Sequence, residues 1–201
     1  MAYPTVSGPY GLIPINLIGG QVFAGATRQI PIATNSSTAI FYGDVVKLNS
    51  DGTLDKDTGT TAATPVGVFL GCSYTDPVFG KTFRQSYPGG IAATDIQAYV
   101  LDDPDALFKV AVVTAYNSTT IGYVNRTAVG NNAVLAQNVG STITGNSQVV
   151  ISATTNTTST WPVRVIDTVP ETATAGNPGS YTEVIVNWNQ GMHQYLNPTG
   201  V

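Results

Sequence analysis

The stretch at residues 41–72, FYGDVVKLNSDGTLDKDTGTTAATPVGVFLGC, decides the fold because it alternates β-prone runs with tight turns. Residues 44–48 are rich in β-branched side chains, and Asn-Ser-Asp-Gly at 49–52 is a turn sequence whose glycine tolerates a positive φ. After a return strand and a polar loop, residues 66–74 have the composition of a buried strand. This order predicts a small β-barrel unit. Within the last strand, Gly67 and Gly71 predict a close backbone approach or a bend of the sheet.

The rest of the chain continues the β pattern and divides into three parts. Further strands are expected at residues 81–87, 96–101, 106–113, 134–136, 148–153, 163–167 and 183–188. The Asp-Asp-Pro-Asp loop at 102–105 predicts a hairpin between its two flanking strands. We expect an all-β protein of small barrel or sandwich units, with an arm at 1–33, a first barrel-like unit at 34–113 and a second β-rich half with a tail at 114–201.

The first 33 residues predict an extended arm, because frequent prolines and glycines exclude a helix or a long strand. The arm is nevertheless apolar and must pack on something. It either crosses its own barrel or lies in a groove of a neighbouring subunit, where it would add to a sheet edge. The residues expected at a capsid or partner interface are Leu12, Ile13, Ile15, Leu17, Ile18, Val22 and Phe23.

Composition limits the classes of partner. The 201 residues carry only 10% charged side chains and a net charge of −4, and the eight basic residues are scattered along the chain. No cationic track is available to bind phosphates, so nucleic-acid binding is not expected. The apolar start of the chain has no basic region before it and is broken by prolines, which argues against a signal peptide. No apolar run reaches the length of a membrane span, and no membrane partner is expected.

Few residues are suited to catalysis or to metal binding. Any Ser-His-Asp or Cys-His site would have to use His193, the single histidine, which lies in a Gly/Pro-punctuated tail. Cys72, the single cysteine, has the surroundings of a buried small hydrophobe and excludes an intrachain disulfide. One histidine and one cysteine do not make a conventional zinc site. We therefore expect no enzyme, no catalytic residues, no cofactor and no metal.

Carboxylates and aromatic side chains leave alternatives open. The aspartates at 102, 103 and 105 either chelate calcium or cap the turns of a loop, and turn chemistry is the favoured interpretation. Exposed tyrosine and tryptophan side chains would suit sugar stacking or a protein interface. Trp161, before a proline, and Trp188, at a strand end, are expected to close a barrel rather than to hold a ligand.

Several short motifs resemble virion structural proteins. The motifs G-D-V-V-x-L, D-G-T-L and V-G-V-F-x-G within 43–71 resemble the β-barrel unit of capsid decoration (cement) proteins of tailed bacteriophages. Y-T-E-V-I-V-N-W-N at 181–189 and N-A-V-L at 132–135 resemble virion proteins of short-tailed phages, including those of cyanobacteria. The resemblance implies a protein that binds the outside of an icosahedral shell, bridges major capsid subunits and assembles as a homo-oligomer, a dimer or a trimer.

Two function classes follow from these features. The first is a structural cement protein, made in the host cytoplasm and located on the capsid exterior of the virion. The second is a carbohydrate- or receptor-binding surface module of the virion, for which the tyrosine and tryptophan supply would be the signature.

Overall fold

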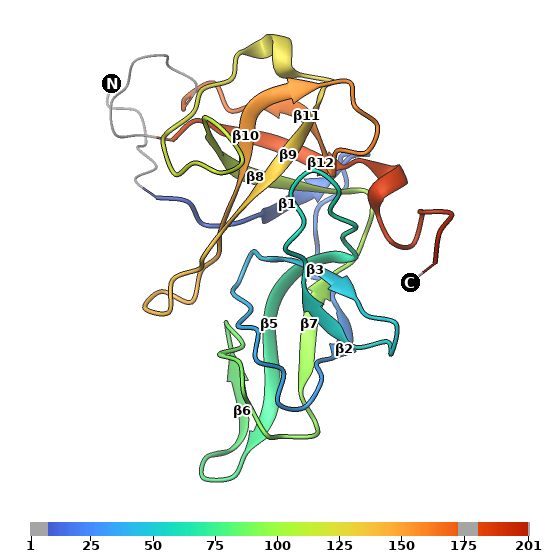
Figure 1. Cartoon of the computed structure of the whole chain (residues 1–201), viewed down its shortest axis with the longest axis vertical. Helices are drawn as coiled ribbons and strands as arrows, with labels where there is room; N and C mark the ends of the chain where they lie inside the picture. The colour runs from blue at the N-terminus through green and yellow to red at the C-terminus, as the bar shows by residue number, and fades with distance from the viewer. Residues whose placement is uncertain (1–7, 173–180, 201) are drawn as a thin grey trace.

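The computed structural model describes residues 8–172 and 181–200, and it confirms the predicted all-β fold class (Figure 1). One sheet contains β1 (Ile13–Leu17), β8 (Ala106–Val113), β9 (Asn132–Asn138), β10 (Gln148–Asn156), β11 (Val163–Thr168) and β12 (Glu183–Trp188). The other contains β2 (Arg28–Pro31), β3 (Val45–Leu48), β4 (Leu54–Lys56), β5 (Gly67–Asp76), β6 (Gly80–Arg84) and β7 (Gln97–Leu101). The helical elements in the described chain are two 3-10 turns, η1 (Arg126–Ala128) and η2 (Gln190–Met192).

The first sheet closes into a five-stranded barrel in the order β8, β10, β9, β11, β12 and back to β8. The closure is short, since β8 and β10 pair in parallel only at Val112 with Ile151 and at Val113 with Ser152. β1 adds antiparallel to the start of β8, where Ile13 pairs with Lys109. Alternate side chains of these strands, most of them valine, fill the barrel interior around Phe108 and Trp188.

The second sheet runs β2, β7, β5, β3, β4, with β6 paired to the far half of β5. It curls around a core of its own, and a parallel bridge between Ile32 and Leu54 links its two ends. The turn predicted at 49–52 is confirmed, because Gly52 has φ 79° and the Asn49 amide donates to the Thr53 carbonyl at 2.8 Å. Figure 1 shows this sheet below the barrel, with the β5–β6 hairpin at the end farthest from it.

The hairpin predicted between residues 96–101 and 106–113 is wrong. β7 pairs with β2 and β5 in the second sheet, whereas β8 lies in the barrel, so the Asp-Pro loop carries the chain from one sheet to the other. The strand pairing does not follow the boundary expected at residue 113 between the first unit and the second half. β8, which ends at that residue, lies in one sheet with β9 to β12. Residues 13–17 and 28–31 of the expected arm are strands of the chain's own sheets.

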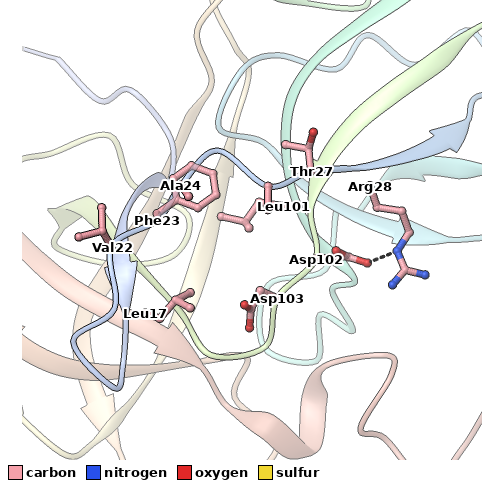
Figure 2. A pocket seen from close by; sticks show the side chains of 10 residues that line it. Leu17, Val22, Phe23, Ala24, Thr27, Arg28, Leu101, Asp102 and Asp103 are labelled. Atoms are coloured by element: carbon pink, nitrogen blue, oxygen red, sulfur yellow. Dashed lines mark ion pairs between the residues drawn. The ribbon is translucent and has the colours of Figure 1, made fainter.

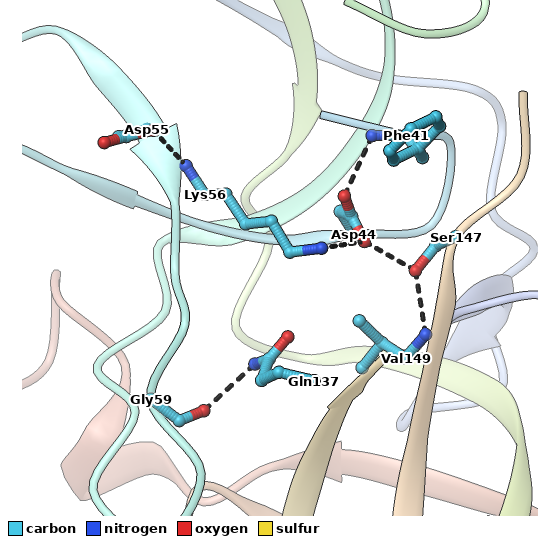
Figure 3. Close-up of polar contacts among 8 residues, drawn as sticks. All are labelled: Phe41, Asp44, Asp55, Lys56, Gly59, Gln137, Ser147 and Val149. Atoms are coloured by element: carbon cyan, nitrogen blue, oxygen red, sulfur yellow. Dashed lines mark hydrogen bonds and ion pairs between the residues drawn. The ribbon is translucent and has the colours of Figure 1, made fainter. Parts of the chain in front are cut away.

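A buried polar cluster and shared apolar packing join the two sheets. Val45, Val68 and Leu101 of the second sheet pack into the same core cluster as the barrel interior. Asp44, which is 0% exposed, accepts hydrogen bonds from Lys56 Nζ at 3.0 Å and from the Ser147 hydroxyl at 2.6 Å (Figure 3). Since Ser147 lies just before β10, this contact ties the barrel to the second sheet.

Candidate partner-binding site

The turn that follows β1 presents apolar side chains to solvent. An antiparallel bridge joins Asn16 to Val22, and the Gly20 amide donates to the Leu17 carbonyl at 2.9 Å. Gly20 has φ 80°, a conformation that glycine adopts without strain. The side chains of Ile18 and Val22 are 53% and 78% exposed. We call residues 17–22 the apolar turn.

A cavity of about 500 Å³ lies beside the apolar turn (Figure 2). Its apolar wall includes Leu17, Phe23 and Leu101, and its polar wall includes Arg28 and Asp102. Leu17 and Phe23 also pack against the barrel core, so the wall is held by the fold rather than by the loop alone. The volume is that of a pocket able to receive a small molecule or the side chains of a partner.

An ion pair neutralises part of the polar wall, whereas Asp103, which also lines the cavity, has no ion-pair partner among the described residues. Arg28 Nε lies 2.6 Å from the Asp102 carboxylate, and the two side chains are 61% and 15% exposed. The Arg28 guanidinium also lies over the ring of Tyr195, 5.3 Å from its centroid. Burial raises the pKa of Tyr195, and the nearby Asp102 carboxylate adds to the shift, so the phenol is neutral at physiological pH. The cavity therefore suits an occupant that is largely apolar and carries no negative charge.

The residues predicted for the partner interface do not form one surface. Leu12 is 0% exposed and belongs to the barrel core, so its side chain is not available to a partner. Ile13, Ile15, Leu17 and Phe23 are half-buried. Only Ile18 and Val22 are exposed. Within residues 8–33, residues 13–17 and 28–31 pair with strands of the chain's own sheets, whereas residues 18–22 are exposed.

The other residues singled out in the sequence lie mostly in packed positions. Cys72 is buried, as predicted, and burial raises the pKa of its thiol to about 11. Trp188 is a core residue, as predicted, but Trp161 is half-buried and lies outside the apolar clusters. His193 is 0% exposed, and its ring centroid lies 5.4 Å from that of Tyr195. Burial lowers the pKa of His193, which keeps the imidazole neutral.

Among the aspartates that could have held calcium, one caps a turn and another forms an ion pair. Asp103 Oδ1 accepts from the Asp105 amide at 2.8 Å, and Asp102 pairs with Arg28. Within residues 8–172 and 181–200, no group of three or more His, Cys, Asp or Glu side chains is placed to hold a metal ion.

Two exposed apolar groups were missed in the sequence. Val78, Phe79 and Phe83 of the β5–β6 hairpin are 79%, 79% and 70% exposed. Val139 and Ile143, in the loop between β9 and β10, are 82% and 95% exposed. The signal available was the Asp-Pro-Val-Phe-Gly turn at 76–80, which places two large apolar residues at a hairpin tip.

No protein-family model matches this chain, and neither a curated protein nor a solved structure matches it. No helix among the described residues is long and apolar enough to cross a membrane.

Proposed function

We propose that this chain is a structural virion protein that binds the outer surface of an icosahedral phage capsid and stabilises it. The observation that carries the proposal is the apolar turn, whose exposed Ile18 and Val22 flank a cavity with an apolar wall. Exposed apolar side chains around a concave site are typical of protein interfaces. The motifs that resemble capsid decoration proteins support the choice of partner.

In this proposal the partner is the major capsid protein. An apolar side chain of a capsid subunit enters the cavity against Leu17 and Phe23, while Ile18 and Val22 cover its neighbours. The Arg28–Asp102 pair at the rim gives orientation to polar groups of the partner. The protein acts by binding alone, without a catalytic step or a cofactor, and its place is the capsid exterior.

Binding of this kind stabilises a shell by mass action. A protein that binds only the assembled shell stabilises it by RT ln(1 + [L]/Kd) per site, which is about 2.7 kcal/mol at a hundredfold excess over Kd. The stabilising free energies of the many sites on one shell add together. Decorated shells should therefore resist heat better than bare shells.

The test uses purified full-length protein and empty shells of the phage that encodes it. We expect the protein to co-sediment with the shells. We also expect it to raise the temperature at which the shells open and a dye reaches their interior. Unchanged melting of saturated shells would reject the stabilising role and leave surface recognition. Failure to co-sediment at protein concentrations up to about 100 µM, where even a weak site is filled, would reject capsid binding altogether.

A second candidate function is carbohydrate or receptor binding by the loop after β8. Tyr116 and Tyr123 are 49% and 44% exposed; Tyr116 lies in the loop that a bridge between Val113 and Ile121 closes, and Tyr123 follows this bridge. Exposed tyrosine rings stack on sugars. Specific binding to a glycan array, lost on replacing both tyrosines with serine, would favour this function.

A further inference from the structure

Strand β6 has one free edge. It pairs antiparallel with β5 from Cys72 opposite Arg84 to Asp76 opposite Gly80, and no other described strand pairs with it. The hairpin that contains it lies at the end of the molecule opposite the barrel (Figure 1). An edge of this kind presents unpaired backbone amides and carbonyls that can add another strand.

We propose that two copies of this chain join through β6, antiparallel, about a two-fold axis at Thr82, so that the two second sheets become one. The inference goes beyond capsid binding and does not rest on it. Because such an axis is perpendicular to the sheet, Gly80 lies opposite Arg84 of the second copy, and Lys81 lies opposite its Phe83. Residues opposite each other share a face of the sheet.

Charge complementarity is the main argument for this pairing. Asp76 Oδ1 accepts from the amides of Val78 and Phe79 at 2.8 and 3.0 Å, while its Oδ2 accepts no bond from the described chain. Arg84 has no ion-pair partner among the residues described. In the dimer, Asp76, Gly80 and the second copy's Arg84 occupy one row of one face. Gly80 has no side chain, and no atom lies within 4 Å of the point that a Cβ would occupy there. The second copy's Arg84 can therefore extend across Gly80 to Asp76 Oδ2.

The opposite face adds a second pair of contacts. Lys81 lies opposite the second copy's Phe83, whose ring is largely exposed in one chain and packs on the aliphatic part of the lysine side chain. Lys81 Nζ is held 3.2 Å from Asp95 on the same chain. This ion pair draws the ammonium over the face of the sheet and away from the edge, where a free lysine would oppose strand addition. The two-fold axis produces each contact twice.

Other registers about a two-fold axis are less favourable. An axis at Lys81 places the two Lys81 ammonium groups opposite each other, and like charges in that position are destabilising. An axis at Phe83 places Arg84 opposite Thr82, in the row of Tyr74, where there is no carboxylate. The axis at Thr82 is the one that brings Arg84 to an acid, and it also places the two Thr82 hydroxyls side by side.

The test is sedimentation equilibrium of the full chain at about 1–100 µM, a range that covers micromolar association. We expect a species of twice the 20.9 kDa chain mass. Arg84→Glu, which places two carboxylates in one row, should raise the dimer dissociation constant at least about tenfold, the equivalent of 1.4 kcal/mol. Arg126→Glu makes the same charge change on the barrel, where Arg126 is 77% exposed, and should leave the constant unchanged.

Hydrogen exchange gives a second readout, because the free-edge amides of residues 80–84 should be protected in the dimer and not in the Arg84→Glu variant. A monomer throughout the concentration range would overturn the inference. So would a trimer, or a dimer that Arg84→Glu leaves intact. Since these measurements use the protein alone, they can fail while capsid binding holds, and the reverse is equally true.

Discussion

Asp44 links the two sheets through a buried cluster of polar groups. Its carboxylate is fully buried and accepts from the Phe41 amide, the Lys56 ammonium and the Ser147 hydroxyl. Ser147 in turn accepts from the Val149 amide at 3.0 Å, so the network continues into β10. Removing one member of such a cluster leaves the others desolvated and without a partner.

We therefore expect Asp44→Ala to lower the free energy of unfolding by about 3 kcal/mol, because it leaves a buried ammonium group uncompensated. Urea unfolding followed by tryptophan fluorescence measures this loss. Asp167→Ala removes an exposed partner of Arg126 and should cost about 1 kcal/mol or less. The double variant Asp44→Ala, Lys56→Met should lose less than Asp44→Ala alone. Equal losses in the Asp44 and Asp167 variants would contradict this role.

Two glycines show what could be predicted at the residue scale. A Cβ on Gly67 would lie 2.1 Å from the Leu101 carbonyl oxygen, and Gly71 has φ 141° at a register shift between β5 and β7. The close approach and the bend predicted at these positions are both confirmed, because each follows from the local chain. The partners of Asp44 could not be predicted in this way, since Ser147 is about a hundred residues distant in the sequence.

At the scale of elements, strand positions were predictable and strand partners were not. The alternation of β-branched residues marks a strand wherever it pairs, so the ranges expected for β3 to β12 agree with the structure to within a few residues. An Asp-Pro loop signals a turn but does not specify whether the chain returns to the same sheet. β7 and β8 therefore have the predicted positions and different neighbours. Because strand partners could not be predicted, the candidate site could not be predicted in full either. The pairing of β1 with β8 buries part of the apolar N-terminal segment that was expected to contact a partner.

The C-terminal segment provides a prediction about pH. Burial lowers the pKa of His193, although the carboxylates of Asp102 and Asp103 act in the opposite direction. Between this folded-state pKa and the unfolded value of about 6.5, the unfolded chain binds more protons than the folded one. The free energy of unfolding should therefore fall as pH falls below about 6.5, by at most about 1.4 kcal/mol per pH unit from this group.

His193→Phe isolates this contribution, because it retains an aromatic ring against Tyr195 and removes the titrating group. The variant should show a shallower dependence of unfolding free energy on pH between about 5 and 7, whatever its absolute stability. The raised pKa of Asp57, caused by burial, affects both proteins equally and cancels in the comparison. Identical slopes in the two proteins would show that His193 titrates as freely in the folded chain as in the unfolded one.

At the scale of the whole molecule, the proposed contact with the capsid should depend little on salt. The apolar turn contributes Ile18 and Val22, and full burial of each is worth about 1.5–3 kcal/mol, whereas an exposed ion pair is worth about 1 kcal/mol or less. Apolar burial is not screened as charges are. We expect the bound fraction in co-sedimentation with shells to change less than about twofold between roughly 0.05 and 1 M NaCl, where screening of surface ion pairs becomes strong.

Replacing Ile18 and Val22 with aspartate should release the protein from the shells, because charged groups would then have to be buried at the contact. These two residues suit the test better than Ile15 or Leu17, which are half-buried against the chain's own barrel. Ile143→Asp is the matched control, since Ile143 is 95% exposed on a different loop. If a few hundred millimolar NaCl releases the unaltered protein completely, charge rather than apolar burial carries the contact, and the apolar turn is not the docking surface.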